Sequence, residues 1–144
     1  MSEPLFLSSM VVHQWQCDHF GHLNVRYYGA AFDDAVFIFW QRLGAEIPAL
    51  GAPGTMPVTA EVKTSFASEA MPGTIARMNG RVLRVGNKSA TLSLEMTDER
   101  TGRHLASCEV VEVFFDMQAR QSRPIPEALR ARLLKVAEAG GDRR

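Results

Sequence analysis

The chain has 144 residues, a length that suits a single domain with one hydrophobic core. Its 16 Lys and Arg balance 16 Asp and Glu, which excludes the strongly basic surface by which proteins bind nucleic acid or an anionic membrane. The two cysteines, Cys17 and Cys108, follow no disulfide or metal-binding spacing, so we expect reduced thiols in a cytoplasmic protein.

The first part of the chain predicts a strand and a long helix. Glu3 stands where a signal peptide needs positive charge, and no segment has the roughly 18 apolar residues of a membrane helix, so we expect a soluble protein. Residues 5–15 are typical of a strand with a polar interruption. From Asn24 to Leu43 apolar residues recur at steps of three and four, which predicts an amphipathic helix ended by Gly44. Its apolar stripe comprises Tyr28, Phe32, Ala35, Val36, Phe39, Trp40 and Leu43.

Two large apolar residues of this helix, Phe37 and Ile38, lie off the stripe. A helix that packs against the protein on one side alone would place polar residues there. We therefore expect the helix to be covered on more than one side, by a curled sheet or by a second subunit.

The pattern changes to a period of two in the second half of the chain. After a Pro- and Gly-rich loop at about 47–57, alternating residues predict a strand that starts near Val58. One predicted face carries Val58, Ala60, Val62, Thr64 and Phe66, and the other carries Thr59, Glu61, Lys63 and Ser65. Further strands are predicted at 74–85, 89–96 and 104–116.

Turn and helix signals complete this half. Gly80, inside the second of these strands, predicts a bulge, and residues 98–102 predict a hairpin connection. Two prolines then precede a short amphipathic helix at 127–138 and a polar tail at 139–144.

The order of strand, long helix and three or four sequential antiparallel strands predicts an α+β fold in one domain, residues 1–144. One helix and one sheet of this size bury each other only if the sheet curls around the helix. Such an arrangement leaves the outer sheet face and the sheet edges available to a partner.

The segment CDHFGHLN, residues 17–24, contains the candidate catalytic and metal-binding side chains. Asn24 is a good N-cap, and the unbonded amides of the following helical turn form a positive pole suited to an anion or an oxyanion. Asp18 lies six residues earlier, in a loop that Gly21 allows to fold tightly. A carboxylate beside such a pole amounts to a nucleophile or base next to an oxyanion hole, which is what acyl transfer requires.

Two other interpretations of the segment stay open. An aspartate before a helix is often only a cap or turn former. Asp18, His19, His22 and Cys17 are also metal-ligand types, but a catalytic zinc site needs correctly spaced ligands on a rigid element and a distant third, so we predict no metal. We expect His22 and Asn24 to fix the loop by hydrogen bonds.

The same residues resemble a known family. Asp18-x-x-Gly21-His22-Leu23-Asn24, followed by Tyr28 and by Phe32-Asp33-x-Ala35, is similar to the 4-hydroxybenzoyl-CoA thioesterase branch of the hotdog-fold proteins. That family has an Asp-x-x-Gly-His-Val-Asn loop ahead of a long central helix. The resemblance covers roughly residues 8–127.

The resemblance implies a hotdog fold, an antiparallel sheet of five or six strands wrapped around one long central helix. It implies an acyl-CoA thioesterase that needs no cofactor, since coenzyme A is part of the substrate, and that forms homodimers by joining sheets edge to edge, or homotetramers. The catalytic residues it implies are Asp18, Gly21, His22, Asn24 and Val25, with the Val25 amide polarising the thioester carbonyl. The substrate-binding residues it implies are Tyr28, Lys88 and Ser89.

The sequence departs from the family at two places and leaves the chemistry open at others. Many relatives have a second acid where Gln16 stands and a second Asn where Val25 stands. Asp18 either attacks the carbonyl to form an anhydride or deprotonates a water, and because aspartate is weakly basic at neutral pH the nucleophilic role is slightly favoured. The alternatives to a thioesterase are a hydratase or dehydratase of the same fold, which needs an acid paired with His22, and a non-catalytic acyl-thioester-binding protein.

Overall fold

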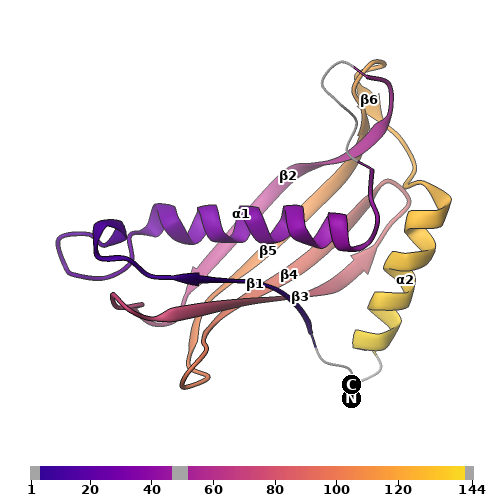
Figure 1. Cartoon of the computed structure of the whole chain (residues 1–144). Helices are drawn as coiled ribbons and strands as arrows, with labels where there is room; N and C mark the ends of the chain where they lie inside the picture. The colour runs from indigo at the N-terminus through magenta and orange to yellow at the C-terminus, as the bar shows by residue number, and fades with distance from the viewer. Residues whose placement is uncertain (1–3, 47–51, 142–144) are drawn as a thin grey trace.

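Six strands and two α-helices make up most of the part that the computed structural model describes, residues 4–46 and 52–141 (Figure 1). In chain order the elements are β1 (Leu5–Val11), a 3₁₀ turn (Gln14–Gln16), α1 (Val25–Arg42), β2 (Thr55–Phe66), β3 (Ile75–Val85), β4 (Ser89–Asp98), β5 (His104–Asp116), β6 (Gln121–Ser122) and α2 (Glu127–Gly141).

The strands form one antiparallel sheet in the order β1-β3-β4-β5-β2, and the short β6 pairs with β5. β3, β4 and β5 follow one another as neighbouring hairpins, while β2, which precedes them in the chain, lies beyond β5 at one edge. The predicted hairpin at 98–102 is confirmed: Asp98 Oδ1 accepts the N–H groups of Arg100 and Thr101, and Gly102 adopts φ 77°. The α+β class with an antiparallel sheet is therefore as the sequence predicts.

α1 lies against the inner face of this sheet, as Figure 1 shows. Asn24 caps its N-terminus by accepting the Arg26 N–H at 3.1 Å. All seven residues of the predicted apolar stripe are buried, including Phe32 and Phe39, so the predicted helix and its buried face are confirmed. Gly44, at φ 81°, ends the helix in the left-handed conformation that favours glycine.

The second predicted helix is also present. α1 has 18 residues, and α2 continues past the predicted limit at residue 138 to Gly141, so the first residues of the predicted polar tail are helical; residues 142–144 of that tail lie outside the described residues. α2 covers the part of the sheet beyond the end of α1, burying Leu129 and Leu133. Arg132 joins the two helices by donating to the carbonyl of Leu43 at 2.9 Å.

Two details of the strands differ from the prediction. Gly80 marks no bulge: it pairs in register with Leu5 and Leu94, and a Cβ there would lie 2.9 Å from Leu7 Cδ1, so close packing explains the glycine. The register between β3 and β4 shifts a little further along, between Val82 and Arg84, and a second shift that matters for the site lies in β2, between Thr59 and Glu61, where the register with β5 changes by one residue. A one-residue shift transfers every following side chain to the opposite face.

Neither α1 nor α2, within the described residues, combines the length and the apolar character that crossing a bilayer requires. Cys17 and Cys108 are both free thiols.

The β2 strand, at one open edge of the sheet, leaves Val62 and Phe66 about half exposed.

Replacing Gly80 with alanine tests the close packing at that position. The new Cβ must displace two buried leucine side chains, because Leu94 Cδ2 lies only 3.1 Å from its position, and we expect a loss of about 1–2 kcal/mol in the free energy of unfolding. Gly29→Ala is the matched control, since a Cβ there meets no atom within 4 Å and alanine favours the helix by about 1 kcal/mol. Denaturant titration measures both, and an unchanged stability of Gly80→Ala would show that the two leucines repack freely.

Candidate active site

The loop between β1 and α1 folds back on itself as a small hairpin. The N–H of Asp18 donates to the carbonyl of His22 at 2.8 Å, and the N–H of Asn24 donates to Gln16 at 2.9 Å. Gly21 provides the turn at φ 82°, a conformation that only glycine adopts without strain. Residue 18 is thereby held beside the segment from which α1 starts.

The carboxyl group of Asp18 is half-buried and fixed on one side. Its Oδ1 accepts the backbone N–H of Phe20 at 2.9 Å and, more weakly, that of His22 at 3.4 Å. Its Oδ2 accepts no hydrogen bond from any residue that the structure describes. One oxygen is thus used to orient the side chain and the other is available to a substrate or a water.

The start of α1 provides an unbonded donor close to this carboxyl group. Asn24 Oδ1 takes the N–H of Arg26, while the N–H of Val25 has no partner within the described part of the chain. The loop and the helix start are tied to the connection between β2 and β3, because Leu23 donates its N–H to the carbonyl of Ala70 at 2.8 Å. The helix end is therefore a fixed positive pole with one free N–H group.

Tyr28 lies beneath the loop and is 4% exposed. Its ring meets that of Phe66 edge to face at 5.0 Å, and its hydroxyl is hydrogen-bonded to the backbone of Ala70. Burial raises the pKa of this phenol above its ordinary value of 10.0, and the charges of Glu69 and Asp18 act in the same direction. The structure thus places Tyr28 next to Asp18 as a neutral, largely covered side chain.

Exposed aromatic rings flank the loop on its solvent side. Trp15 and Phe20 are 71% and 70% exposed, yet both are held in place by neighbours. Trp15 meets Tyr27 edge to face at 5.6 Å, and Phe20 lies 4.1 Å from the ring of His19. The five cavities described for this chain do not have Asp18 in their linings, and the carboxyl group has an apolar rim formed by these rings.

Lys88 and Ser89 lie at the opposite end of the sheet from Asp18. Lys88 lies in the turn between β3 and β4 and Ser89 begins β4, on the side of α2, whereas the loop with Asp18 lies at the other end of the sheet (Figure 1). The ten residues of β4 separate the two ends by about 30 Å. Within a single chain the structure therefore brings together Asp18, Gly21, His22, Asn24, Val25 and Tyr28, and leaves Lys88 and Ser89 apart.

A buried carboxyl group that the sequence analysis did not single out lies under the C-terminal half of α1. Glu112 is 2% exposed; its Oε1 accepts Trp40 Nε1 at 2.8 Å and its Oε2 accepts the Thr59 hydroxyl at 2.5 Å. Burial raises the pKa of Glu112 above its ordinary value of 4.5, opposed by these two hydrogen bonds and reinforced by the charge of Asp33. The sequence does contain a sign of this group: Glu112 is an acidic residue at a position of β5 where the alternation, with Val110 before it and Phe114 after it, calls for an apolar residue.

Thr59 reaches this carboxyl group because of the bulge in β2. The alternation of the sequence placed it with Glu61 and Lys63 on the polar face, which is wrong. Because the shift lies between Thr59 and Glu61, Thr59 is on the same side of β2 as Val62 and Thr64, the side that faces α1.

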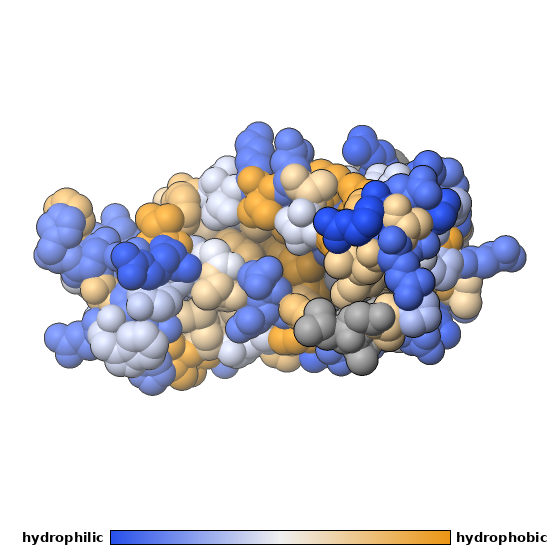
Figure 2. Space-filling view, turned by 90° about the horizontal axis from the view of Figure 1, so that it is seen from above, coloured by the Kyte–Doolittle hydropathy of each residue, from blue (hydrophilic) through white to orange (hydrophobic). Residues whose placement is uncertain are grey.

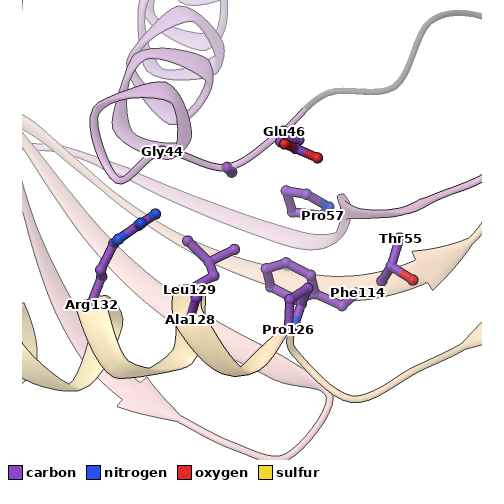
Figure 3. A pocket seen from close by; sticks show the side chains of 10 residues that line it. Gly44, Glu46, Thr55, Pro57, Phe114, Pro126, Ala128, Leu129 and Arg132 are labelled. Atoms are coloured by element: carbon purple, nitrogen blue, oxygen red, sulfur yellow. The ribbon is translucent and has the colours of Figure 1, made fainter.

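Another pocket, of about 410 Å³, lies among the end of α1, the start of β2 and α2. Figure 3 shows Phe114, Leu129 and Pro57 across its middle, with Glu46 and Arg132 on opposite sides. It lies far from Asp18, and the Arg132 guanidinium already donates to Leu43. Within the described residues no three His, Cys, Asp or Glu side chains gather as a metal site would require.

Comparison with known proteins gives the family. The sequence profile of the thioesterase-like superfamily matches residues 11–133, most of the chain. The chain belongs to the thioesterase-like superfamily. This confirms the resemblance seen in the loop and helix motif. A search of curated proteins gave no significant match.

Solved structures agree with this thioesterase-like fold. A protein from Pseudomonas aeruginosa is 23% identical, with a TM-score of 0.77 over 93% of this chain and 96% of that one. A 1,4-dihydroxy-2-naphthoyl-CoA thioesterase from Synechocystis is 14% identical, with a TM-score of 0.76 over 91% and 96%. A Staphylococcus aureus protein solved in complex with CoA is 19% identical, with a TM-score of 0.77 over 94% and 86%. At these identities the likeness establishes the hotdog fold alone.

The buried Glu112 makes stability depend on pH. A carboxyl group whose pKa is higher in the folded than in the unfolded chain stabilises the fold fully below 4.5, and this contribution is lost as pH rises through the raised folded pKa. We expect Glu112→Gln to remove that loss, so that denaturant midpoints of wild type and variant separate in favour of the variant between pH 5 and pH 8. Glu109→Gln, an exposed neighbour on β5, is the control, and parallel pH profiles of wild type and Glu112→Gln would contradict the effect of burial.

Proposed function

We propose that this member of the thioesterase-like superfamily is an acyl-CoA thioesterase, which hydrolyses a thioester to a carboxylate and free coenzyme A. One observation carries the proposal: Asp18 has one carboxylate oxygen free and is held beside the start of α1, where the Val25 N–H is also free. Family membership gives this pair a matching reaction class.

Each residue of the loop has a role in this proposal. Asp18 is the nucleophile or the general base, and the Val25 N–H at the helix end polarises the thioester carbonyl and stabilises the oxyanion. Gly21, His22 and Asn24 hold the loop in shape through its turn and its backbone hydrogen bonds. Tyr28 supports the loop from below and closes the substrate site on that side.

The proposal includes a homodimer formed through β2. This edge strand has 12 residues, and exposed apolar side chains follow it and the adjacent face of α1. They are Val25, Phe37, Val62 and Phe66. An unpaired edge with such a surface favours addition of another strand, and two copies of β2 pair with each other in antiparallel fashion under twofold symmetry.

This pairing accounts for the position of Lys88. Antiparallel β2 strands bring the Phe66 end of one chain, next to Tyr28, against the Thr55 end of the other. The Thr55 end lies near the start of β4, since β5 pairs with both strands there. The partner's Lys88 and Ser89 thereby approach Asp18, where they meet the phosphates of coenzyme A, and the partner supplies a wall of the site.

Asp18→Asn tests the reaction. We expect turnover to fall by roughly three orders of magnitude or more, because the amide is neither a nucleophile nor a base, while stability and coenzyme A affinity stay nearly unchanged. Thiol release from short, branched, aromatic and long acyl-CoAs is the assay, with Asp34→Asn, on the exposed side of α1, as the matched control. Tight coenzyme A binding by wild type without any thiol release would identify a binding protein instead, and hydration of crotonyl-CoA would identify a hydratase.

A single turnover in heavy-oxygen water separates the two roles of Asp18. Label found in the Asp18 carboxyl group supports the anhydride, since water then attacks a covalent intermediate. Label found only in the released acid means that water attacked the acyl carbon, as it does when Asp18 acts as a general base; trapping experiments with hydroxylamine then show whether an anhydride also forms.

Mixing two inactive variants tests the composite site. Asp18→Asn and Lys88→Glu are each expected to be impaired, but their heterodimer contains one site with both wild-type residues if Lys88 serves the partner. An equimolar, re-equilibrated mixture should then recover about a quarter of wild-type activity, since half of the dimers carry one intact site of two. A mixture no more active than its components would place both residues in the same subunit's site.

A further inference from the structure

Two small cavities follow the line between α1 and β2, each of about 100 Å³. They share Asp33, Val36 and Thr59 in their linings, so they lie next to each other along the helix, and we refer to the two together as the channel. Figure 2, which views the molecule from above, shows a hollow with apolar side chains along the middle of this face.

The lining of this channel changes along its length. The cavity nearer the N-terminus of α1 is largely apolar, with Phe32, Val62 and Val110 in its walls. The cavity nearer the C-terminus of α1 is lined by Glu112 and Thr59 together with Phe37, Trp40 and Met56. The channel thus resembles a pocket for an alkyl segment that ends against hydrogen-bonding groups.

The polar end is not required by the fold. A carboxyl group at 2% exposure is energetically unfavourable, and replacing buried polar groups with apolar residues of similar size is often neutral or stabilising. Glu112 has no cationic partner, since neither cavity is lined by Lys, Arg or His among the described residues. Its two oxygens each accept one protein donor and retain a further lone pair.

We propose that this channel is the acyl pocket and that Glu112, with Thr59, selects an acyl group bearing a hydrogen-bond donor at its far end, a hydroxyl or an ammonium. This rests on the proposed thioesterase function. A donor group bonds to the free lone pairs of the carboxyl group, whereas a terminal methyl leaves them unsatisfied in a dry cavity. A terminal carboxylate is rejected, because Asp33 and Glu112 both line this end.

The position of the polar end determines the chain lengths that test it. Along its own helix the channel begins about 8 Å from Asn24 and reaches Trp40 at about 24 Å. In the proposed dimer the two α1 helices run in opposite directions, so the polar end of one chain lies closer to the partner's Asp18. A long acyl chain is needed to reach the polar end from Asp18 of the same chain, and a short one reaches it from the partner's Asp18.

The experiment measures kcat/KM for thiol release within matched trios of acyl-CoAs. The short trio is 6-hydroxyhexanoyl-, 6-aminohexanoyl- and heptanoyl-CoA, and the long trio is 12-hydroxydodecanoyl-, 12-aminododecanoyl- and tridecanoyl-CoA. We expect the donor-ended members to exceed the methyl-ended member by about tenfold in at least one trio. An ammonium preferred over a hydroxyl indicates a cationic acyl group, and the reverse indicates an alcohol.

Two variants assign this preference to the polar end. Glu112→Gln should lower the advantage of the ammonium most, since the charge is lost while an acceptor for Trp40 remains. Thr59→Val, which leaves Glu112 in place, should reduce the preference as well, and Glu109→Gln should leave it unchanged. Equal rates within both trios in wild type, or a preference that survives both variants, would overturn the proposal.

A failure of the proposed function gives a different result. If no acyl-CoA releases thiol, the thioesterase assignment is wrong, and calorimetric binding of the same trios to wild type still measures the preference for a donor. Tighter binding of the donor-ended members supports the selective pocket, and equal binding overturns it.

Discussion

The seating of α1 on the inner face of the sheet is the constraint on which the rest of the structure depends. Phe32, Ala35 and Phe39 are almost completely buried there, and they fix the height and direction of the helix. Because the N–H of Leu23 donates to the carbonyl of the buried Ala70, the loop before the helix is fixed to the connection between β2 and β3. The free N–H at the helix start and the carboxyl group of Asp18 therefore belong to one short segment that the core holds in place.

The same packing leaves one side of α1 uncovered, and the open edge of β2 follows that side. Long unpaired edges are rare in natural sheets, which protect them with charges, prolines or bulges. β2 has Pro57 in its first half and a bulge between Thr59 and Glu61. Its second half, with Val62 and Phe66, is exposed and regular. The edge and the uncovered face of the helix are thus one surface, and in the proposed dimer one partner strand with its own helix covers both.

The sequence predicted the elements that depend on local pattern, and it failed where long-range register decides. The stripe of α1, its cap at Asn24 and the loop motif follow from spacing alone, and the structure has them as expected. Thr59 was assigned to the wrong face because a bulge is a property of the strand pair and depends on β5. Glu112 was overlooked because its role depends on Trp40, 72 positions away in the chain. The separation of Lys88 from Asp18 is likewise set by strand order, which the motif does not encode.

The inner face of the sheet is also less uniformly apolar than a stable core requires. Glu112, Thr59 and Trp40 form a satisfied polar cluster at a place where Phe and Leu would pack without a desolvation penalty. Such a cluster lies on the wall of a channel, not in the closed core around Leu92 and Leu94. A polar group that served only rigidity would be equally effective away from the channel. The proposed recognition of what enters the channel accounts for its position on this wall, and in the proposed thioesterase it links the choice of acyl group to α1.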